Sequence, residues 1–204
     1  MHAISAIRAE GLACVRGGRE VFVGVGLAVE AGALLVIEGA NGAGKTSLLR
    51  MLAGFIPPAA GQIIVEGAEG TIGDSEDRAK LIGWLGHSDA AKPQLTPLEV
   101  FSFFARLYGS AAPASGLLRE IGLERAAGLP CLYLSAGQKK RLALARLKLT
   151  ARPIWLLDEP LASLDEEGKS LVLRFLNEHC HEGGMAIVAS HEPVAPEAAR
   201  LRLG

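Results

Sequence analysis

The chain of 204 residues has the length of one domain, or of one domain with a modest inserted lobe. Half of its residues are apolar and a further 25 are glycines, which together exceed the roughly 45–50% of an ordinary soluble domain. This composition excludes a disordered chain, and 21 basic against 22 acidic residues give no indication of nucleic-acid binding. The longest uncharged apolar runs near the start, residues 21–29 and 31–37, are shorter than the ~18–20 residues of a membrane helix. The apolar excess therefore predicts a surface that contacts another protein.

Apolar periodicity and turn residues in the first part of the chain predict strands at 21–29 and 34–38, a helix at 48–53, a strand at 62–66 and a short apolar run at 81–85. The middle part is predicted to contain a helix at 97–108, a small-residue loop at 111–116 with short helices up to 128, and a helix at 138–150. In the last part we expect a buried strand at 154–157, a helix at 166–181 and a buried strand at 185–189. The two buried strands do not alternate, which is typical of a parallel sheet covered on both faces. Strands that alternate with helices predict an α/β fold, and the strand-poor stretch 88–150 predicts a helical lobe.

A glycine-rich motif follows the predicted strand 34–38. Its residues are Gly39, Ala40, Asn41, Gly42, Ala43, Gly44, Lys45 and Thr46, which match GxxxxGK[ST], followed by Ser47. Glycines let backbone N–H groups turn toward phosphate oxygens, and the N-terminus of the next helix adds partial positive charge. Lys45 is expected to reach the β- and γ-phosphates and Thr46 to hold Mg²⁺. An ordinary glycine-rich turn is disfavoured because a strand precedes the motif and a helix follows it.

Two acidic residues, Asp158 and Glu159, end the buried strand 154–157. They lie at the carboxyl end of the strand, where ligands bind in open α/β sheets. Asp158 suits a Mg²⁺ shell, and Glu159 is the natural general base for an attacking water. Alone, the pair would equally fit a strand that ends in a solvated turn, but the phosphate-binding motif upstream favours the catalytic interpretation.

A third motif opens the helix that runs to residue 150. It consists of Leu134, Ser135, Ala136, Gly137 and Gln138, and its Ser and Gln have the spacing of a capping box. The stretch resembles the LSGGQ signature of ATP-binding cassette (ABC) proteins, with Ala136 in place of the first glycine. Further motifs follow in the order of that family: Ser163, Leu164 and Asp165 resemble its D-loop, and His191 resembles its switch histidine.

These five ordered motifs are similar to those of ABC-type nucleotide-binding subunits over nearly the whole chain. The resemblance implies a P-loop NTPase with a RecA-like core at about 1–87 and 151–204, an N-terminal antiparallel β part and a helical subdomain at about 88–150. It implies that ATP and Mg²⁺ bind, and that Lys45, Asp158, Glu159 and His191 are catalytic. It also implies a head-to-tail homodimer in which the signature of one subunit completes the ATP site of the other.

Two positions depart from the family pattern. Where a Gln usually contacts Mg²⁺ after the run at 81–85, this chain has His87 and Ser88, so His87 is the expected substitute beside the metal ligands Thr46 and Asp158. Upstream of the P-loop, no Tyr is available to stack on adenine. Arg16 is expected to stack its guanidinium on the base, whereas Phe22 is more consistent with a core residue.

The short chain, the Leu85-Gly86-His87 turn and the Ala-containing signature resemble the ATP-binding subunits of haem exporters in cytochrome c maturation. That resemblance implies membrane subunits of the CcmB and CcmC type and a peripheral position at the cytoplasmic face of a bacterial inner membrane. The energy of ATP would support export of haem or release of a haem-loaded chaperone. No CxxCH motif is present, and His179 and His181 are expected on a solvated helix end, so direct haem binding is not expected.

Three other functions stay open. Another ABC exporter, for lipid, peptide or drug, would carry the same catalytic residues and differ in its partners. A non-transport ABC protein that acts on DNA or ribosomes is disfavoured by the near-neutral charge and the absence of a coiled-coil insertion. A nucleotide-sensing scaffold without turnover is disfavoured by the complete catalytic set.

The predicted helix 97–108 offers a surface for a membrane partner. Its predicted core face consists of Leu98, Phe101, Ala105 and Tyr108, which recur with helical spacing. A second apolar sector consists of Phe103, Phe104 and Leu107. A helix that is apolar on most sides is either buried all round or docks a partner.

Overall fold

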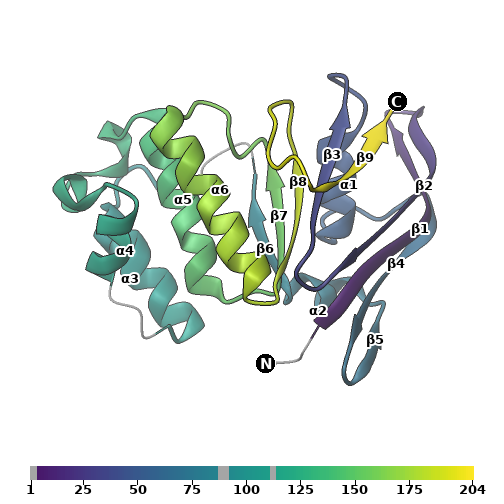
Figure 1. The fold of residues 1–204 in the computed structure, drawn as a ribbon, viewed down its shortest axis with the longest axis horizontal. Helices are drawn as coiled ribbons and strands as arrows, with labels where there is room; N and C mark the ends of the chain where they lie inside the picture. The colour runs from purple at the N-terminus through teal and green to yellow at the C-terminus, as the bar shows by residue number, and fades with distance from the viewer. Residues whose placement is uncertain (1–3, 87–91, 111–113) are drawn as a thin grey trace.

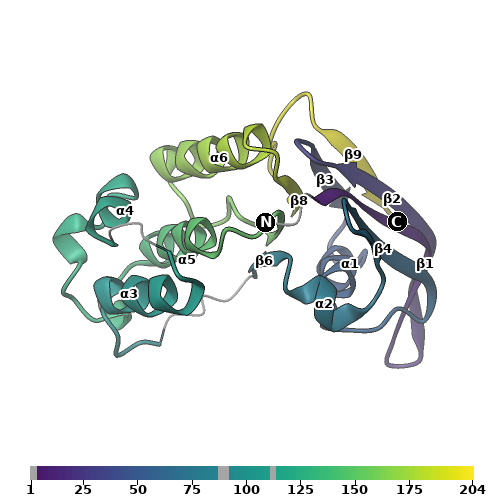
Figure 2. The ribbon, with the colours of Figure 1, turned by 90° about the horizontal axis from the view of Figure 1, so that it is seen from below.

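The computed structural model describes residues 4–86, 92–110 and 114–204. Within them lie two β-sheets and two groups of helices (Figures 1 and 2). The smaller sheet lies at one end of the molecule and the helices α3 to α5 lie at the other, with the larger sheet between them.

The smaller sheet is antiparallel and has the strand order β2-β1-β4-β5. Its strands are β1 (Ile4–Arg16), β2 (Arg19–Glu30), β4 (Ala60–Gly67) and β5 (Gly70–Ile72). The implied antiparallel β part is therefore confirmed. Strand β1 is missing from the predicted elements because register shifts on both sides of Leu12 interrupt the alternation of its side chains.

The larger sheet is parallel and has the order β6-β7-β8-β3-β9. Its strands are β3 (Leu34–Gly39), β6 (Ile82–Leu85), β7 (Ile154–Asp158), β8 (Met185–Ala189) and β9 (Ala199–Leu203). Strand β9 is also missing from the predicted elements. It is an edge strand that carries Arg200 and Arg202 and buries only Leu203, so its sequence lacks an apolar run.

Side chains that alternate along the parallel strands face two separate cores. One core joins the sheet to helix α1 (Lys45–Leu52) and to the antiparallel sheet, and contains Leu35, Ile37, Leu156 and Ile187. The other joins the sheet to helices α5 (Ala136–Thr150) and α6 (Glu166–His181), and contains Val36, Leu157 and Val188. The parallel sheet is covered on both faces, which is why β8 and residues 154–157 of β7 are apolar.

The remaining helical elements are α2 (Ser75–Ala79), α3 (Pro97–Tyr108), α4 (Ala114–Glu120) and the 3₁₀ turns η1 (Glu124–Ala126) and η2 (Cys131–Tyr133). Thr96 and Glu99 form a capping box at the start of α3. The predicted loop 111–116 is wrong at 114–116, because burial of Leu117 and Leu118 holds the small residues before them in a helix. Residues 111–113 lie outside the described part, and the subdomain boundaries stay a prediction.

Helix α3 buries a different face from the predicted one. Phe101 is fully buried and Ala105 is half-buried, as expected, but Leu98 and Tyr108 are exposed. The inward stripe runs through Val100, Phe101 and Phe104, and Phe104 packs against the core. Tyr108 stacks on Phe104 at 6.1 Å between ring centroids. The second predicted sector divides accordingly, with Phe103 and Leu107 exposed and Phe104 half-buried.

Ion pairs tie helices α4, α5 and α6 together. Lys148 Nζ on α5 lies 2.9 Å from Glu120 Oε1 on α4 and 2.8 Å from Glu178 Oε2 on α6. Arg174 on α6 contacts the same two carboxylates. No helix of the described residues is both long enough and apolar enough to cross a membrane.

His179 corrects the expectation of a solvated helix end. Its ring is half-buried and stacks on Trp155 of β7 at 3.9 Å between centroids, while Gly184 leaves room for the ring because it has no Cβ. Burial lowers the pKa of His179, outweighing hydrogen bonds to the backbone at Met185 and Pro153 that act in the opposite direction. His181 is exposed, as expected.

We expect the free energy of unfolding to decrease as the pH falls through the ordinary pKa of histidine, because the unfolded chain then binds a proton that folded His179 excludes. This contribution of His179 to the free energy of unfolding is fully present above the ordinary pKa of histidine. It is lost as the pH falls toward the lower pKa of His179 in the folded state. Urea unfolding at about pH 7.5 and about pH 5.5 measures it. His179→Phe should lose less stability between these pH values than the parent, whereas exposed His181→Phe should behave like the parent. Equal losses in the parent and His179→Phe would contradict this assignment.

Candidate active site

The P-loop connects the end of β3 to the start of α1. Helix α1 begins at Lys45, and its N-cap residue Gly44 has a left-handed backbone with φ 96°. A Cβ at Gly44 would lie 2.7 Å from Val21 Cγ1 and 2.8 Å from Phe22 Cδ1. Only glycine combines this conformation with the close approach of β2. The first N–H groups of α1 therefore have no side-chain cap and are available to an anion.

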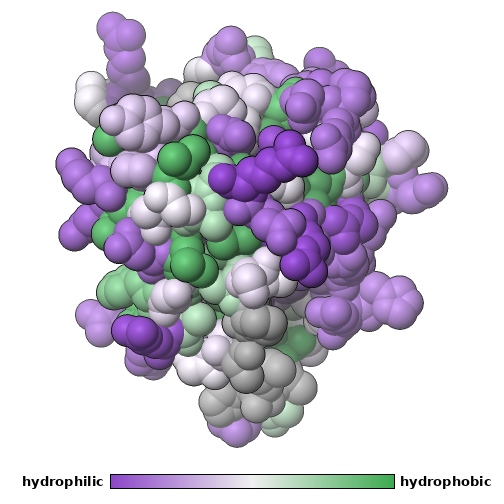
Figure 3. Space-filling model, turned by 90° about the vertical axis from the view of Figure 1, so that its left-hand side faces the viewer, coloured by the Kyte–Doolittle hydropathy of each residue, from purple (hydrophilic) through white to green (hydrophobic). Residues whose placement is uncertain are grey.

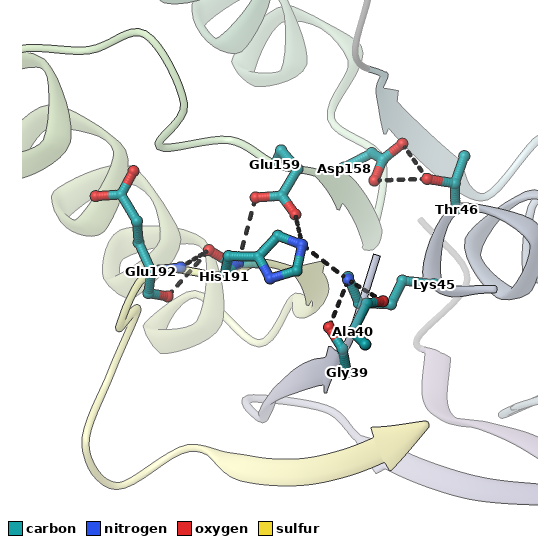
Figure 4. A network of polar contacts seen from close by, with 9 residues as sticks. Gly39, Ala40, Lys45, Thr46, Asp158, Glu159, His191 and Glu192 are labelled. Carbon is teal, nitrogen blue, oxygen red and sulfur yellow. Dashed lines mark hydrogen bonds and ion pairs between the residues drawn. The ribbon is translucent and has the colours of Figure 1, made fainter. Parts of the chain in front are cut away.

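Lys45 folds back into the P-loop and is almost fully buried. Its ammonium donates to the carbonyl oxygens of Gly39 at 2.8 Å and Ala40 at 3.2 Å, and lies 3.0 Å from His191 Nε2 (Figure 4). His191 Nε2 also lies 3.6 Å from Glu159 Oε1, so its ring stands between the ammonium of Lys45 and the carboxylate of Glu159.

Asp158 and Thr46 face each other across the site. The Thr46 hydroxyl, in the first turn of α1, lies 2.9 Å from Asp158 Oδ2 and 3.1 Å from Oδ1. Asp158 ends β7, where the adjacent strand β8 helps to leave it only 4% exposed. The two side chains predicted to hold a metal are therefore brought together, and both supply hard oxygen atoms.

Glu159 occupies a left-handed backbone conformation, with φ 50°, immediately after β7. Its N–H donates to the carbonyl of Ala189 at 2.9 Å, which fixes the turn. The turned side chain accepts from the backbone N–H of His191 at 3.3 Å (Figure 4). Such a conformation is costly for a residue with a Cβ and is typical of functional sites. It places a partly accessible carboxylate at the edge of the phosphate-binding loop.

The structure brings together most of the predicted nucleotide-binding and catalytic residues in one pocket. Its lining consists of Val21, Asn41, Gly42, Gly44, Lys45, Thr46, Ser47, Arg50, Asp158, Glu159, Ala162 and His191. Sequence reasoning missed Val21, Arg50 and Ala162. The sequence could have indicated Arg50, because Arg50 lies one helical turn after Thr46 and therefore on the same face of α1.

Two predicted contributors are placed elsewhere. Arg16 lies at the exposed tip of the β1–β2 hairpin, opposite Arg19, and does not line the pocket. The hairpin presents Val21 to the pocket instead, and Phe22 is buried against Gly44, as the core interpretation requires. His87 lies outside the described residues.

The signature residues lie beside the pocket without lining it. Ser135 Oγ accepts from the Gln138 N–H at 3.1 Å, and Gln138 Oε1 accepts from the Ser135 N–H at 2.9 Å, which completes the predicted capping box. A Cβ at Gly137 would lie 3.0 Å from the Ser163 carbonyl, so the D-loop packs on the start of α5. In turn, Asp165 caps α6 through a hydrogen bond from the Gly168 N–H at 2.9 Å.

Topology places these motifs on one edge of the molecule. Helix α5 leads into β7 and α6 leads out of it, so both helices begin at the edge where the parallel strands end (Figure 1). None of Leu134, Ser135, Ala136, Gly137 and Gln138 contributes to the described lining of the pocket. One chain therefore presents a phosphate-binding half and a separate signature half to the same side.

The glycine-rich loop before α1, the acidic end of β7, the capped start of α5 and His191, in this arrangement, indicate an ATP-binding cassette. The sequence profile of the ABC transporter family matches residues 22–162. The chain belongs to the ABC transporter family.

Relatives within that family match over nearly its whole length. The cytochrome c biogenesis ATP-binding export protein CcmA of Rhodopseudomonas palustris (strain BisB5) is 45% identical over 195 residues, 95% of this chain and 96% of the relative. CcmA of Nitrobacter winogradskyi is 46% identical with the same coverage. A solved structure described as a putative ABC transporter (ATP-binding protein) from Pyrococcus furiosus superposes with a TM-score of 0.83 at 23% identity, covering 98% of both chains. Among ABC transporter proteins, this chain is therefore grouped with CcmA.

Proposed function

We propose that this chain hydrolyses ATP to power haem export, or release of a haem-loaded chaperone, during maturation of c-type cytochromes. The observation that carries the proposal is the convergence of Lys45, Asp158, Glu159 and His191 on one pocket, in a chain that is 43–46% identical to proteins named for cytochrome c biogenesis and export. The residues of the pocket support ATP hydrolysis, and the names of the relatives indicate that cytochrome c biogenesis uses it.

Each residue has a distinct part in the proposed reaction. Lys45 and the first N–H groups of α1 hold phosphate oxygens, and Glu159 accepts a proton from the attacking water. The His191 backbone N–H holds Glu159 Oε2 and so orients the base. Thr46 and Asp158 fit Mg²⁺, because a hydroxyl and a carboxylate 2.9 Å apart are the oxygen donors that this ion prefers. When bound, Mg²⁺ would neutralise charge on the β- and γ-phosphates.

We further propose that two copies of the chain form a head-to-tail homodimer around two ATP molecules. The support is the separation of the signature from the pocket of its own chain, although both open to one edge. A second copy, turned end to end, would bring the capped N-terminus of α5 over the phosphates held by the first copy. Hydrolysis would then require dimerisation.

The proposed partners are membrane subunits of the CcmB and CcmC type at the cytoplasmic face of a bacterial inner membrane. Apolar side chains gather between charged ones on the face made by the helices α3 to α5 (Figure 3). Three exposed apolar side chains of α3, those of Leu98, Phe103 and Leu107, line one groove. An apolar patch on an otherwise charged face is typical of a protein-binding surface.

We expect Phe103→Glu to release the chain from its membrane subunits while ATP binding by the isolated chain stays unchanged. The phenyl ring is 59% exposed on α3, far from the P-loop, so a charge there opposes burial in an interface without disturbing the core. Recovery in the membrane fraction after coexpression with the partners measures the effect. Val23→Glu is the matched control, since Val23 is equally exposed but lies on β2. Unchanged membrane recovery of Phe103→Glu would contradict docking on α3.

Two measurements test the cellular function. Purification of the chain from its native membrane, with the attached subunits identified, separates a haem exporter from an exporter of lipid, peptide or drug. Deletion of the gene should abolish all c-type cytochromes, and a Glu159→Gln copy should fail to restore them. Normal cytochromes in the deletion strain would refute the haem-export proposal and leave the ATPase assignment intact.

A further inference from the structure

The pocket described above holds phosphates well but offers little to an adenine ring. Its described lining contains no Phe, Tyr or Trp side chain, and the residue that β2 presents to it is Val21. The nearby Phe22 is 8% exposed and packs against Gly44, so its face is not available. Arg16 points from the hairpin tip and does not line the pocket. Among the described residues that line the pocket, a Phe, Tyr or Trp partner for the base is therefore missing.

An aromatic side chain lies unused directly before the signature. Tyr133 is 70% exposed, more than any other large apolar side chain in the described chain. Its hydroxyl and ring have no described contact with a hydrogen-bond donor, acceptor or second ring.

The backbone under Tyr133 is nevertheless fixed. The 3₁₀ turn η2 is anchored by buried Cys131 before it and by buried Leu134 after it. The Cys131 and Leu132 N–H groups donate to the carbonyls of Leu95 and Pro93 at 2.8 and 2.9 Å. The turn therefore fixes the backbone from which the Tyr133 side chain projects, which reduces the entropy cost of using the ring as a binding surface.

We propose that Tyr133 of one copy stacks on the adenine of the ATP held by the P-loop of the other copy. The proposal rests on the proposed head-to-tail homodimer, in which Ser135 lies over the partner's phosphates. Tyr133 is two residues from Ser135, so their Cα atoms are at most about 7 Å apart. In that dimer, an exposed ring this close to Ser135 would lie within reach of the partner's bound nucleotide. The second copy thus supplies both the signature and the stacking partner that the first copy lacks.

The test measures how much the base contributes to dimer formation. In the Glu159→Gln background, the concentrations of ATP and of base-free ribose 5-triphosphate that give half-maximal dimer are compared by analytical ultracentrifugation. Stacking of one base contributes enough for about a tenfold or larger preference for ATP. Tyr133→Ala should remove that preference and leave the response to ribose 5-triphosphate unchanged. Tyr133→Phe should retain the preference, and Phe55→Ala, an exposed aromatic outside the signature segment, serves as control.

Monomer binding distinguishes a contribution within one chain from one between chains. At protein concentrations below dimerisation, Tyr133→Ala should bind ATP as tightly as its parent. A weaker monomer affinity, an unchanged preference for ATP in the dimer, or equal losses with both nucleotides would each overturn the proposal. Failure of the parent to dimerise with either nucleotide would refute the proposed homodimer itself, and the stacking role with it.

Discussion

Glu159→Gln is expected to lower ATP hydrolysis by about 100-fold or more while ATP remains bound, because positioned general bases contribute on that order. The substitution keeps the size of the side chain and its capacity to accept from the His191 N–H, now 3.3 Å from Oε2. It removes only the ability to take a proton from water. Phosphate release in steady state, with ATP affinity measured in parallel, separates the two effects.

A second consequence of this substitution concerns assembly. If hydrolysis opens the proposed dimer, the variant should accumulate as an ATP-bound dimer in size-exclusion chromatography, whereas the parent should not. Glu192→Gln is the matched control, because Glu192 neighbours His191 but pairs with Lys169 at 2.6 Å and does not line the nucleotide pocket. Turnover at the parental rate in Glu159→Gln would remove Glu159 from the role of base.

The sequence predicts the elements that carry the chemistry because their signals are local. The P-loop glycines, the apolar run into Asp158 and the capping pair Ser135 and Gln138 each specify a conformation within a few residues, and the structure contains all three. Helix α3 is predicted to the residue for the same reason, since Thr96, Pro97 and Gly109 mark its ends. Such features depend little on the rest of the fold.

Features that depend on distant partners are the ones that sequence reasoning misses. Strand β1 pairs with β2 and β4 through irregular registers, and edge strand β9 is held by β3 alone. The buried face of α3 is set by where α5 lies, so Tyr108 and Leu98 fall outside it. The ring of His179 is half-buried because it packs against Trp155 and Gly184, and both of these residues lie outside α6.

The candidate site shows the same division. The order of the motifs indicates that Lys45, Asp158 and His191 meet, but not that the Lys45 ammonium lies 3.0 Å from His191 Nε2. Nor does it indicate that Val21, rather than Arg16, reaches the pocket, because the length of the β1–β2 hairpin decides that. The role of a site residue can be inferred from the local sequence pattern. Which residues contact one another in the site depends on how the two sheets are assembled.

Lys45→Met should weaken ATP binding by about 10- to 100-fold, since hydrogen bonds to charged groups contribute roughly 1.5–3 kcal/mol and each 1.4 kcal/mol is tenfold. Methionine keeps an unbranched stem of similar length in this buried position and removes the ammonium that reaches the phosphates. Equilibrium titration with ATP measures the loss, and thermal unfolding without nucleotide verifies that the P-loop still folds around Gly39 and Ala40, whose carbonyls lose a donor.

Lys148→Met provides the matched comparison for this variant. Lys148 is also partly buried and paired, but with Glu120 and Glu178, and it does not line the nucleotide pocket. Its loss leaves two carboxylates with one fewer partner, so we expect lower thermal stability with ATP affinity close to that of the parent. If Lys45→Met bound ATP as tightly as Lys148→Met, the phosphate contact would have to come from the N–H groups of α1 alone, and the ammonium of Lys45 would serve the loop rather than the nucleotide.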